Sequence, residues 1–303
     1  MRNLSKLLLI LTLVLSLAVI NNGKVLANAQ ADNYLITGSK NLMQADSFHV
    51  EFNIDISGKD YNVNAFTKSD IQNKKQVSKT DFSFSGNFKD KNFSESFQQY
   101  VELSQSKDNI YTFDGKQWTR MTGSQKVPAK LTPAEIKFID DKIKAIFIGV
   151  IDNQIILENS EYALIDVKII TEKAKDVIIK EFYPQIKPAE RKQIDDIFGN
   201  VGDIDIMIKY NKRNGMLEES KLDLTKNVAT VANNMIDLWG GNNKNKDLYK
   251  SFFQGFNFVI TTNYNRFNQI DDIVIPLEAK VGKLVNTDEF IKTGEKISKT
   301  VAK

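Results

Sequence analysis

The sequence predicts an α+β protein built on antiparallel strands, and three observations support this fold class. Apolar residues from Phe48 to Ile56 alternate with polar ones, which is the period of a strand with one buried face. Two turn dipeptides, Asp114-Gly115 and Asn214-Gly215, separate runs of strand-forming residues. Helical stretches interrupt the strands without alternating regularly with them, which favours helices gathered on one face of an antiparallel sheet.

The first half of the chain begins with a helix predicted at 32–45, although Gly38 weakens its pattern. Residues with the strand period follow at 48–56, 61–65, 82–88 and 110–113. Asp114-Gly115 is predicted to supply the positive φ angles of a type I′ hairpin turn. Asn214-Gly215 is predicted to do the same between strands at 204–210 and 216–224.

The second half mixes helices and strands. Thr132-Pro133-Ala134-Glu135 is a capping box with proline at the first helical position, and an apolar stripe then runs to Val150. The other elements expected are a strand at 155–170, a helix at 171–197 in two pieces broken near Pro184 and Pro188, a helix at 227–239 closed by Gly240, a strand from 256 to 260, and a domain end at 273–276.

The amino terminus has the order of a secretory signal peptide. Arg2 and Lys6 precede an apolar run at 7–20, and Ala27-Asn28-Ala29 follows it. The run has 14 residues, whereas a spanning helix needs about 17–25, so a membrane anchor is the weaker alternative. We expect cleavage after Ala29, with Ala27 as the alternative. The predicted organisation is therefore a signal peptide at 1–29, one domain at 30–280 and a polar, lysine-rich tail at 281–303.

Charge and cysteine content narrow the function classes. The signal holds three basic residues and no acid, so the mature chain carries 38 basic and 38 acidic residues. This balance predicts no nucleic-acid partner. The chain has no cysteine, which excludes disulfides, thiol catalysis, thiolate metal sites and the acylated cysteine of a bacterial lipoprotein. We therefore expect a soluble periplasmic or extracellular bacterial protein with no membrane anchor after cleavage.

Three short sequence segments resemble those of a known protein family. They are Ser47-Phe48-His49-Val50, the run 110–115 followed by Trp118, and Tyr264-Asn265 leading into 273–279. Over residues 32–280 the chain resembles the LolA/LprG-like half-barrel superfamily, and within it an uncharacterised secreted branch. The resemblance implies a strongly curved antiparallel sheet whose concave face is covered by helices and holds acyl chains. Many relatives are lipoproteins, and the missing cysteine puts that tether in doubt here.

Catalytic and metal motifs are weak in this sequence. His49 is the only histidine and stands on the polar phase of its strand, so we expect it to be solvated. Two motifs of penicillin-recognising enzymes occur: S-x-x-K at Ser104-Gln105-Ser106-Lys107 and K-T-G at Lys292-Thr293-Gly294. The serine of the first motif does not begin a predicted helix, as the chemistry of these enzymes requires. The acid pairs at 140–141, 195–196 and 271–272 point in divergent directions on a helix. We predict no enzyme activity, no metal and no cofactor.

The aromatic content is the feature that suggests a ligand. There are 19 Phe, 9 Tyr and 2 Trp residues, and many of the phenylalanines fall in strand phase. They form a filled core or line an apolar cavity for a lipid or other hydrophobic small molecule. The residues predicted to line such a cavity are Phe48, Val50, Phe52, Ile54, Phe82, Phe84, Trp118, Ile206, Ile208, Phe256, Phe258 and Ile260. The alternative function is an envelope module that binds another protein through a sheet with a filled core.

Overall fold

The computed structural model describes residues 28–89, 91–103, 108–123, 150–182, 185–239 and 246–286. The chain forms two compact units. Unit 1 comprises Met1–Gln44 and Leu131–Phe253, and unit 2 comprises Ala45–Lys130 and Gln254–Lys303. Whether both units act as the single domain predicted for 30–280 stays a prediction, and most of the predicted signal and tail lies outside the described residues.

Unit 1 contains an antiparallel sheet with the strand order β10-β9-β8-β7. Its strands are β7 (Ile151–Glu158), β8 (Tyr162–Ile169), β9 (Ile204–Asn211) and β10 (Met216–Asp223). Every second residue of β8 and β9 is buried on one face, as with Ile165 and Ile208, which pair across the two strands. This face is the core of unit 1.

The single strand expected at 155–170 is wrong, because the chain turns back between β7 and β8. The Asn159 side-chain oxygen accepts hydrogen bonds from the backbone N–H groups of Glu161 (2.8 Å) and Tyr162 (2.9 Å). An asparagine that bonds the backbone in this way makes a turn without glycine or proline. The sequence pattern therefore showed no break.

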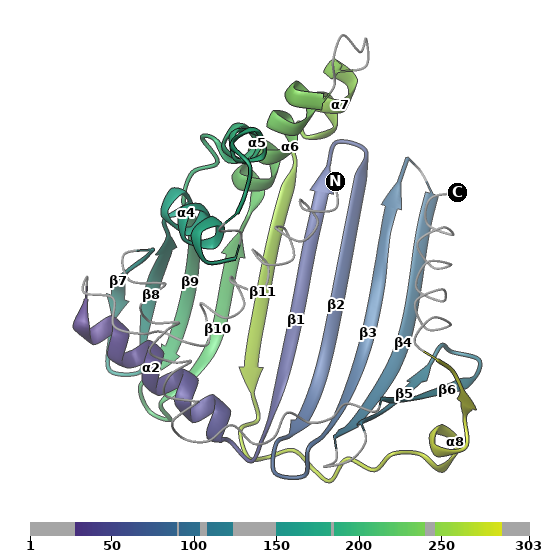
Figure 1. Cartoon of the computed structure of the whole chain (residues 1–303). Helices are drawn as coiled ribbons and strands as arrows, with labels where there is room; N and C mark the ends of the chain where they lie inside the picture. The colour runs from purple at the N-terminus through teal and green to yellow at the C-terminus, as the bar shows by residue number, and fades with distance from the viewer. Residues whose placement is uncertain are drawn as a thin grey trace. The chain divides into compact units, whose positions relative to one another are not determined.

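Helix α2 (Ala29–Gln44) covers the buried face of the unit 1 sheet, as Figure 1 shows. Ala31 and Leu35 are completely buried against the strands. Gly38 allows the close approach, since a Cβ atom there would lie 2.6 Å from Cδ2 of Leu217. The expected leading helix is thus confirmed, and its glycine has a packing role.

The other helices of unit 1 are α4 (Thr171–Phe182), α5 (Pro188–Phe198), α6 (Thr225–Trp239) and α7 (Lys246–Phe252). The predicted break near Pro184 and Pro188 is confirmed, because α4 ends at 182 and α5 begins at Pro188. Lys175 of α4 binds Asp195 of α5 at 2.9 Å and joins the two helices. The helix predicted from Thr132 and the closing role of Gly240 lie outside the described residues.

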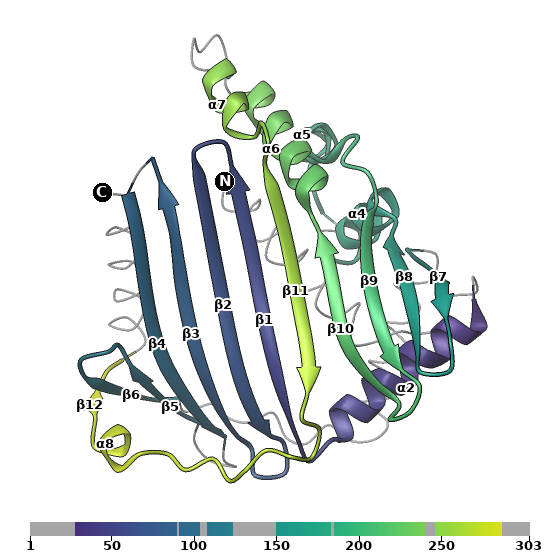
Figure 2. The same ribbon diagram turned by 180° about the vertical axis from the view of Figure 1, so that it is seen from behind.

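The described residues of unit 2 form eight strands in the order β12-β6-β5-β4-β3-β2-β1-β11, seen from both sides in Figures 1 and 2. They are β1 (Ser47–Gly58), β2 (Tyr61–Gln72), β3 (Val77–Phe88), β4 (Lys91–Leu103), β5 (Asp108–Phe113), β6 (Trp118–Gly123), β11 (Asn257–Asn265) and β12 (Lys283–Leu284). All neighbours are antiparallel except β12 and β6. With the helices of unit 1, this confirms the α+β class and the antiparallel pairing.

The segment after β11 runs along one end of the long strands to helix α8 (Leu277–Lys280), which lies beside β5 and β6 (Figure 2). Ile275 and Ala279 are buried there in a cluster with Val77, Tyr100 and Tyr111. The predicted domain end at 273–276 is thus followed by further ordered structure, including β12.

Both predicted type I′ turns are wrong. Gly115 has φ of +87° and Gly215 has φ of +70°, but neither Asp114 nor Asn214 has positive φ. Each loop has four residues, at 114–117 and 212–215. A carboxylate or amide oxygen at the start of each turn accepts two backbone hydrogen bonds, from Asp114 in one case and Asn211 in the other. Such side-chain acceptors favour a longer turn in which one residue alone is left-handed.

We predict that Gly38→Ala lowers the stability of unit 1. Alanine gains about 1 kcal/mol of helix propensity over glycine, but overpacking in a filled site costs about 1–3 kcal/mol. The clash with the buried Leu217 therefore outweighs the gain. Urea denaturation measures the change. Asn33→Ala, on the exposed side of the same helix, is the control and should not destabilise the protein. A higher midpoint for Gly38→Ala would contradict the packing role.

We predict that Gly115→Val destabilises the β5–β6 hairpin by about 1–3 kcal/mol, because a β-branched residue is strained at positive φ. No atom lies within 4 Å of a Cβ built at this position, so the loss comes from the backbone alone. Lys116→Val in the same loop is the control, since Lys116 does not have positive φ. Equal denaturation midpoints for the two variants would show that the turn differs from the one described.

Candidate functional site

One face of the unit 2 sheet is apolar, and it is called the apolar face below. Antiparallel pairing brings residues of the same phase together, so Phe52 lies opposite Thr67, which in turn lies opposite Phe82. The next row joins Ile54, Ala65 and Phe84. The predicted site residues that share this face are Phe48, Val50, Phe52, Ile54, Phe82, Phe84, Phe258 and Ile260.

Most of these side chains are half-buried rather than buried. Phe82 stacks on Phe97 with ring centroids 4.4 Å apart, and Phe84 contacts Phe93 at 5.1 Å. Sequence reasoning missed Phe93 and Phe97, although both have the same strand phase. The signal was obscured because Glu95, between them, shares that phase. The aromatic surface therefore extends over β4 as well as β1 and β3.

Four predicted residues lie elsewhere or at the margin. Ile206 and Ile208 are 2% and 1% exposed in the core of unit 1, where helix α2 covers them. Trp118 lies on the opposite face of unit 2, because it pairs with Phe113 and packs against Tyr100. Phe256 precedes β11 by one residue and contacts Phe258 at 6.3 Å. A strand period alone does not distinguish a filled core from an open face.

The opposite face of unit 2, called the polar face below, carries amide, hydroxyl and charged side chains. Asn64 donates hydrogen bonds to Asn53 (2.7 Å) and Asp55 (2.6 Å) across β1 and β2. His49 lies on this face as its phase predicted, but the expectation of a solvated histidine is wrong. Its side chain is 14% exposed, and Nδ1 lies 2.7 Å from Asp70.

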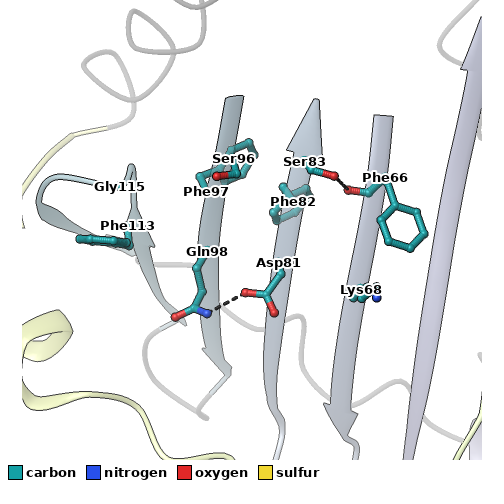
Figure 3. Close-up of a pocket in the computed structure, with 10 residues that line it drawn as sticks. All are labelled: Phe66, Lys68, Asp81, Phe82, Ser83, Ser96, Phe97, Gln98, Phe113 and Gly115. Carbon is teal, nitrogen blue, oxygen red and sulfur yellow. Dashed lines mark hydrogen bonds between the residues drawn. The ribbon is translucent and has the colours of Figure 1, made fainter. Parts of the chain in front are cut away.

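A pocket of about 400 Å³ opens on the polar face. Figure 3 shows its lining, which comes from strands β2 to β5 and the turn after β5. The residues are Phe66, Lys68, Asp81, Phe82, Ser83, Ser96, Phe97, Gln98, Phe113 and Gly115. Phe82 is the one predicted site residue among them. Its side chain belongs to the apolar face, so this pocket is distinct from the predicted cavity, which stays a prediction.

The described residues hold no group of three or more His, Asp or Glu side chains placed to bind a metal ion. Among the same residues, no helix is long and apolar enough to cross a bilayer.

Comparison with known proteins gives weak structural likenesses. Neither the family models nor the curated proteins match this chain. The lipoprotein LppX of Mycobacterium tuberculosis aligns over 82% of this chain and all of its own, with a TM-score of 0.34 and 9% identity. A porin-like protein from Bacteroides uniformis covers 73% of this chain and 97% of its own, with a TM-score of 0.27 and 11% identity. A DUF1329 family protein from Desulfovibrio piger covers 83% of this chain and 96% of its own, with a TM-score of 0.25 and 9% identity. Likenesses at these scores carry no argument about function.

Proposed function

We propose that this chain is an exported binding protein that holds the acyl chain of a lipid, or another hydrophobic molecule, against the apolar face of unit 2. The observation that supports the proposal is the segregation of side chains in one sheet. One phase of β1 is wholly apolar from Phe48 to Ile56, and apolar residues predominate on the same face of β3 and β11. Amides, hydroxyls and charged groups predominate in the other phase of these strands.

The two units differ in how completely their apolar faces are covered. In unit 1, α2 and α4 cover the strands, and Ile165 and Ile206 are at most 2% exposed. In the part of unit 2 that the structure describes, helix α8 packs on the polar face with Tyr100 and Tyr111 instead. Half-buried phenylalanines on the apolar face therefore retain surface that a ligand would cover. Burial of an acyl chain contributes about 0.8 kcal/mol for each CH₂ group.

Several polar side chains on the apolar face pair with one another, although Thr67 lies between Phe52 and Phe82 and the exposed Glu95 lies opposite Phe84. Ser69 and Thr80 lie opposite each other with hydroxyl oxygens 2.9 Å apart, and Gln99 donates to the hydroxyl of Thr112 at 3.3 Å. A hydroxyl or amide that is already hydrogen-bonded to the protein loses less free energy when water is removed from it. A hydrophobic ligand can therefore cover such groups at a lower free-energy cost. This fits the usual make-up of ligand sites, which are mostly apolar with a few placed polar groups.

The resemblance to half-barrel carriers supports the same proposal, and the predicted signal peptide supports an extracytoplasmic location. The sequence motifs that would supply a nucleophile and a base are weak, so we propose a binder rather than an enzyme. The competing proposal is an envelope protein-interaction module. It differs in one physical respect, because its phenylalanines would belong to a filled core and not border a ligand.

The amino-terminal cap of helix α2 distinguishes between the two predicted cleavage sites of the signal peptide. The Asn28 side chain accepts hydrogen bonds from the backbone N–H groups of Gln30 and Ala31, both at 3.1 Å, and so caps the helix. Cleavage after Ala29 would remove this cap, whereas cleavage after Ala27 would keep it. We predict that a chain beginning at Asn28 is more stable than one beginning at Gln30 by about 1 kcal/mol. Amino-terminal sequencing of the exported protein identifies the natural start, and urea melts of both forms measure the difference. Coincident melts would contradict the capping role.

The function is tested by titrating the purified protein with a fluorescent fatty acid. We predict saturable binding that weakens about tenfold in Phe52→Ala, because the side chain lies in the centre of the apolar face. Its urea midpoint should fall less than expected for a core residue, since a half-buried ring loses fewer packed neighbours. Phe66→Ala on the polar face is the matched control and should bind the probe like the wild type.

A filled core gives the opposite result. The wild type would then show no saturable binding, and Phe52→Ala would lose about 3–5 kcal/mol of stability. Ile206→Ala calibrates this outcome, because its side chain is 2% exposed in the core of unit 1. That pattern would reject the carrier and leave the interaction module.

A further inference from the structure

The pocket on the polar face of unit 2 is built from two rows of side chains that cross four strands. Lys68, Asp81, Gln98 and Phe113 lie directly opposite one another along one row. Phe66, Ser83 and Ser96 form the neighbouring row. The register shows no irregularity between β2 and β5, so all seven side chains project on the same face and surround one volume (Figure 3).

An aromatic residue stands at each end of this pocket. Phe66 belongs to β2 and Phe113 to β5, so three strand spacings, about 14 Å, separate them. Phe113 is held by Trp118 at 5.1 Å, and Trp118 by Tyr100 at 5.9 Å. Phe66 lies 5.3 Å from the ammonium group of Lys68. Phe113 is therefore packed in an aromatic cluster, whereas the contact cited for Phe66 is with a lysine whose side chain is 52% exposed.

Groups that both donate and accept hydrogen bonds lie between the two rings. Gln98 donates to Asp81 at 2.6 Å, which fixes the orientation of the amide and leaves its oxygen directed away from that bond. Ser83 and Ser96 are exposed beside them, and the Ser83 hydroxyl donates to the backbone oxygen of Phe66 at 3.5 Å (Figure 3). This combination of carboxylate, amide, hydroxyl and ammonium suits a ligand that presents many hydroxyl groups.

We propose that this pocket binds a neutral oligosaccharide. A sugar ring has hydroxyls at its rim and polarised C–H groups on its faces, and the C–H groups are attracted to the negative face of an aromatic ring. The rings of Phe66 and Phe113 would take sugar units at either end, while Gln98, Asp81 and the serines bind hydroxyls between them.

Other ligand classes fit the pocket less well. Lys68 is the one cation among the described residues that line it, and Asp81 offsets that charge, so the site does not favour an anion. A peptide could not add to the sheet as a strand here, because β3 and β4 are each paired on both sides. Recognition must come from side chains alone. The site is also on the face opposite the proposed acyl surface, so it does not depend on the proposed function.

The test is isothermal titration of the purified protein with cellotetraose, chitotetraose and maltotetraose. We expect saturable binding of at least one, with a dissociation constant of about 1 mM or lower. Gln98→Ala should weaken that binding about tenfold, through the loss of a hydrogen bond and of the group that orients Asp81. Phe113→Ala should weaken it by a similar factor.

Gln99→Ala is the matched control, because Gln99 is the adjacent residue on the same strand and projects on the apolar face. It should bind the sugar like the wild type. Fluorescent fatty-acid binding by Gln98→Ala should also be unchanged, which separates this site from the acyl surface. No saturable binding of any of the three tetrasaccharides overturns the proposal, and so does an equal loss in Gln98→Ala and Gln99→Ala.

Discussion

The in-register antiparallel pairing of β1 with β2 and β11, and of β3 with β2 and β4, determines the chemistry of unit 2. A strand directs successive side chains to opposite faces, so a regular register carries the phase of one strand to the next. Phe52 and Phe82 reach the same face only because Thr67 is opposite both. A slip of one residue would exchange phenylalanine for serine or aspartate across the whole sheet.

The strands of unit 1 also alternate apolar and polar residues, but a helix covers their apolar face. That face is closed by α2, and the closeness of that contact depends on Gly38 lying over Leu217. Tyr34 of the helix stacks on Tyr210 at 4.6 Å and donates to Glu158 at 2.7 Å. Lys212 pairs with the same carboxylate at 2.8 Å. These contacts hold α2 at the sheet, and the hydrogen bonds from Lys212 and then from the Tyr34 hydroxyl lower the pKa of Glu158.

Segregation by phase gives one sheet two kinds of surface. The apolar face of unit 2 gathers Phe82 and Phe97 in a stacked pair, while the residues beside them, Asp81 and Gln98, meet on the polar face. Acyl chains and sugars demand opposite chemistries, and alternate residues of the same strands can supply both. The packing of Phe113 against Trp118 and the hydrogen bond between Gln98 and Asp81 reduce the ordering that binding would require.

The sequence by itself determined the strand phases, the leading helix and the break between α4 and α5, because these depend on local periodicity and on proline. Local pattern was insufficient where a side chain made the turn, as at Asn159, or where Asp114 changed the turn type. Tertiary structure alone decided that Ile206 lies in a closed core while Phe52 is half-buried, since a strand period does not reveal what covers a face. It also decided that Lys68, Asp81, Gln98 and Phe113 form one row, because their register depends on pairing between segments up to 45 residues apart in the chain.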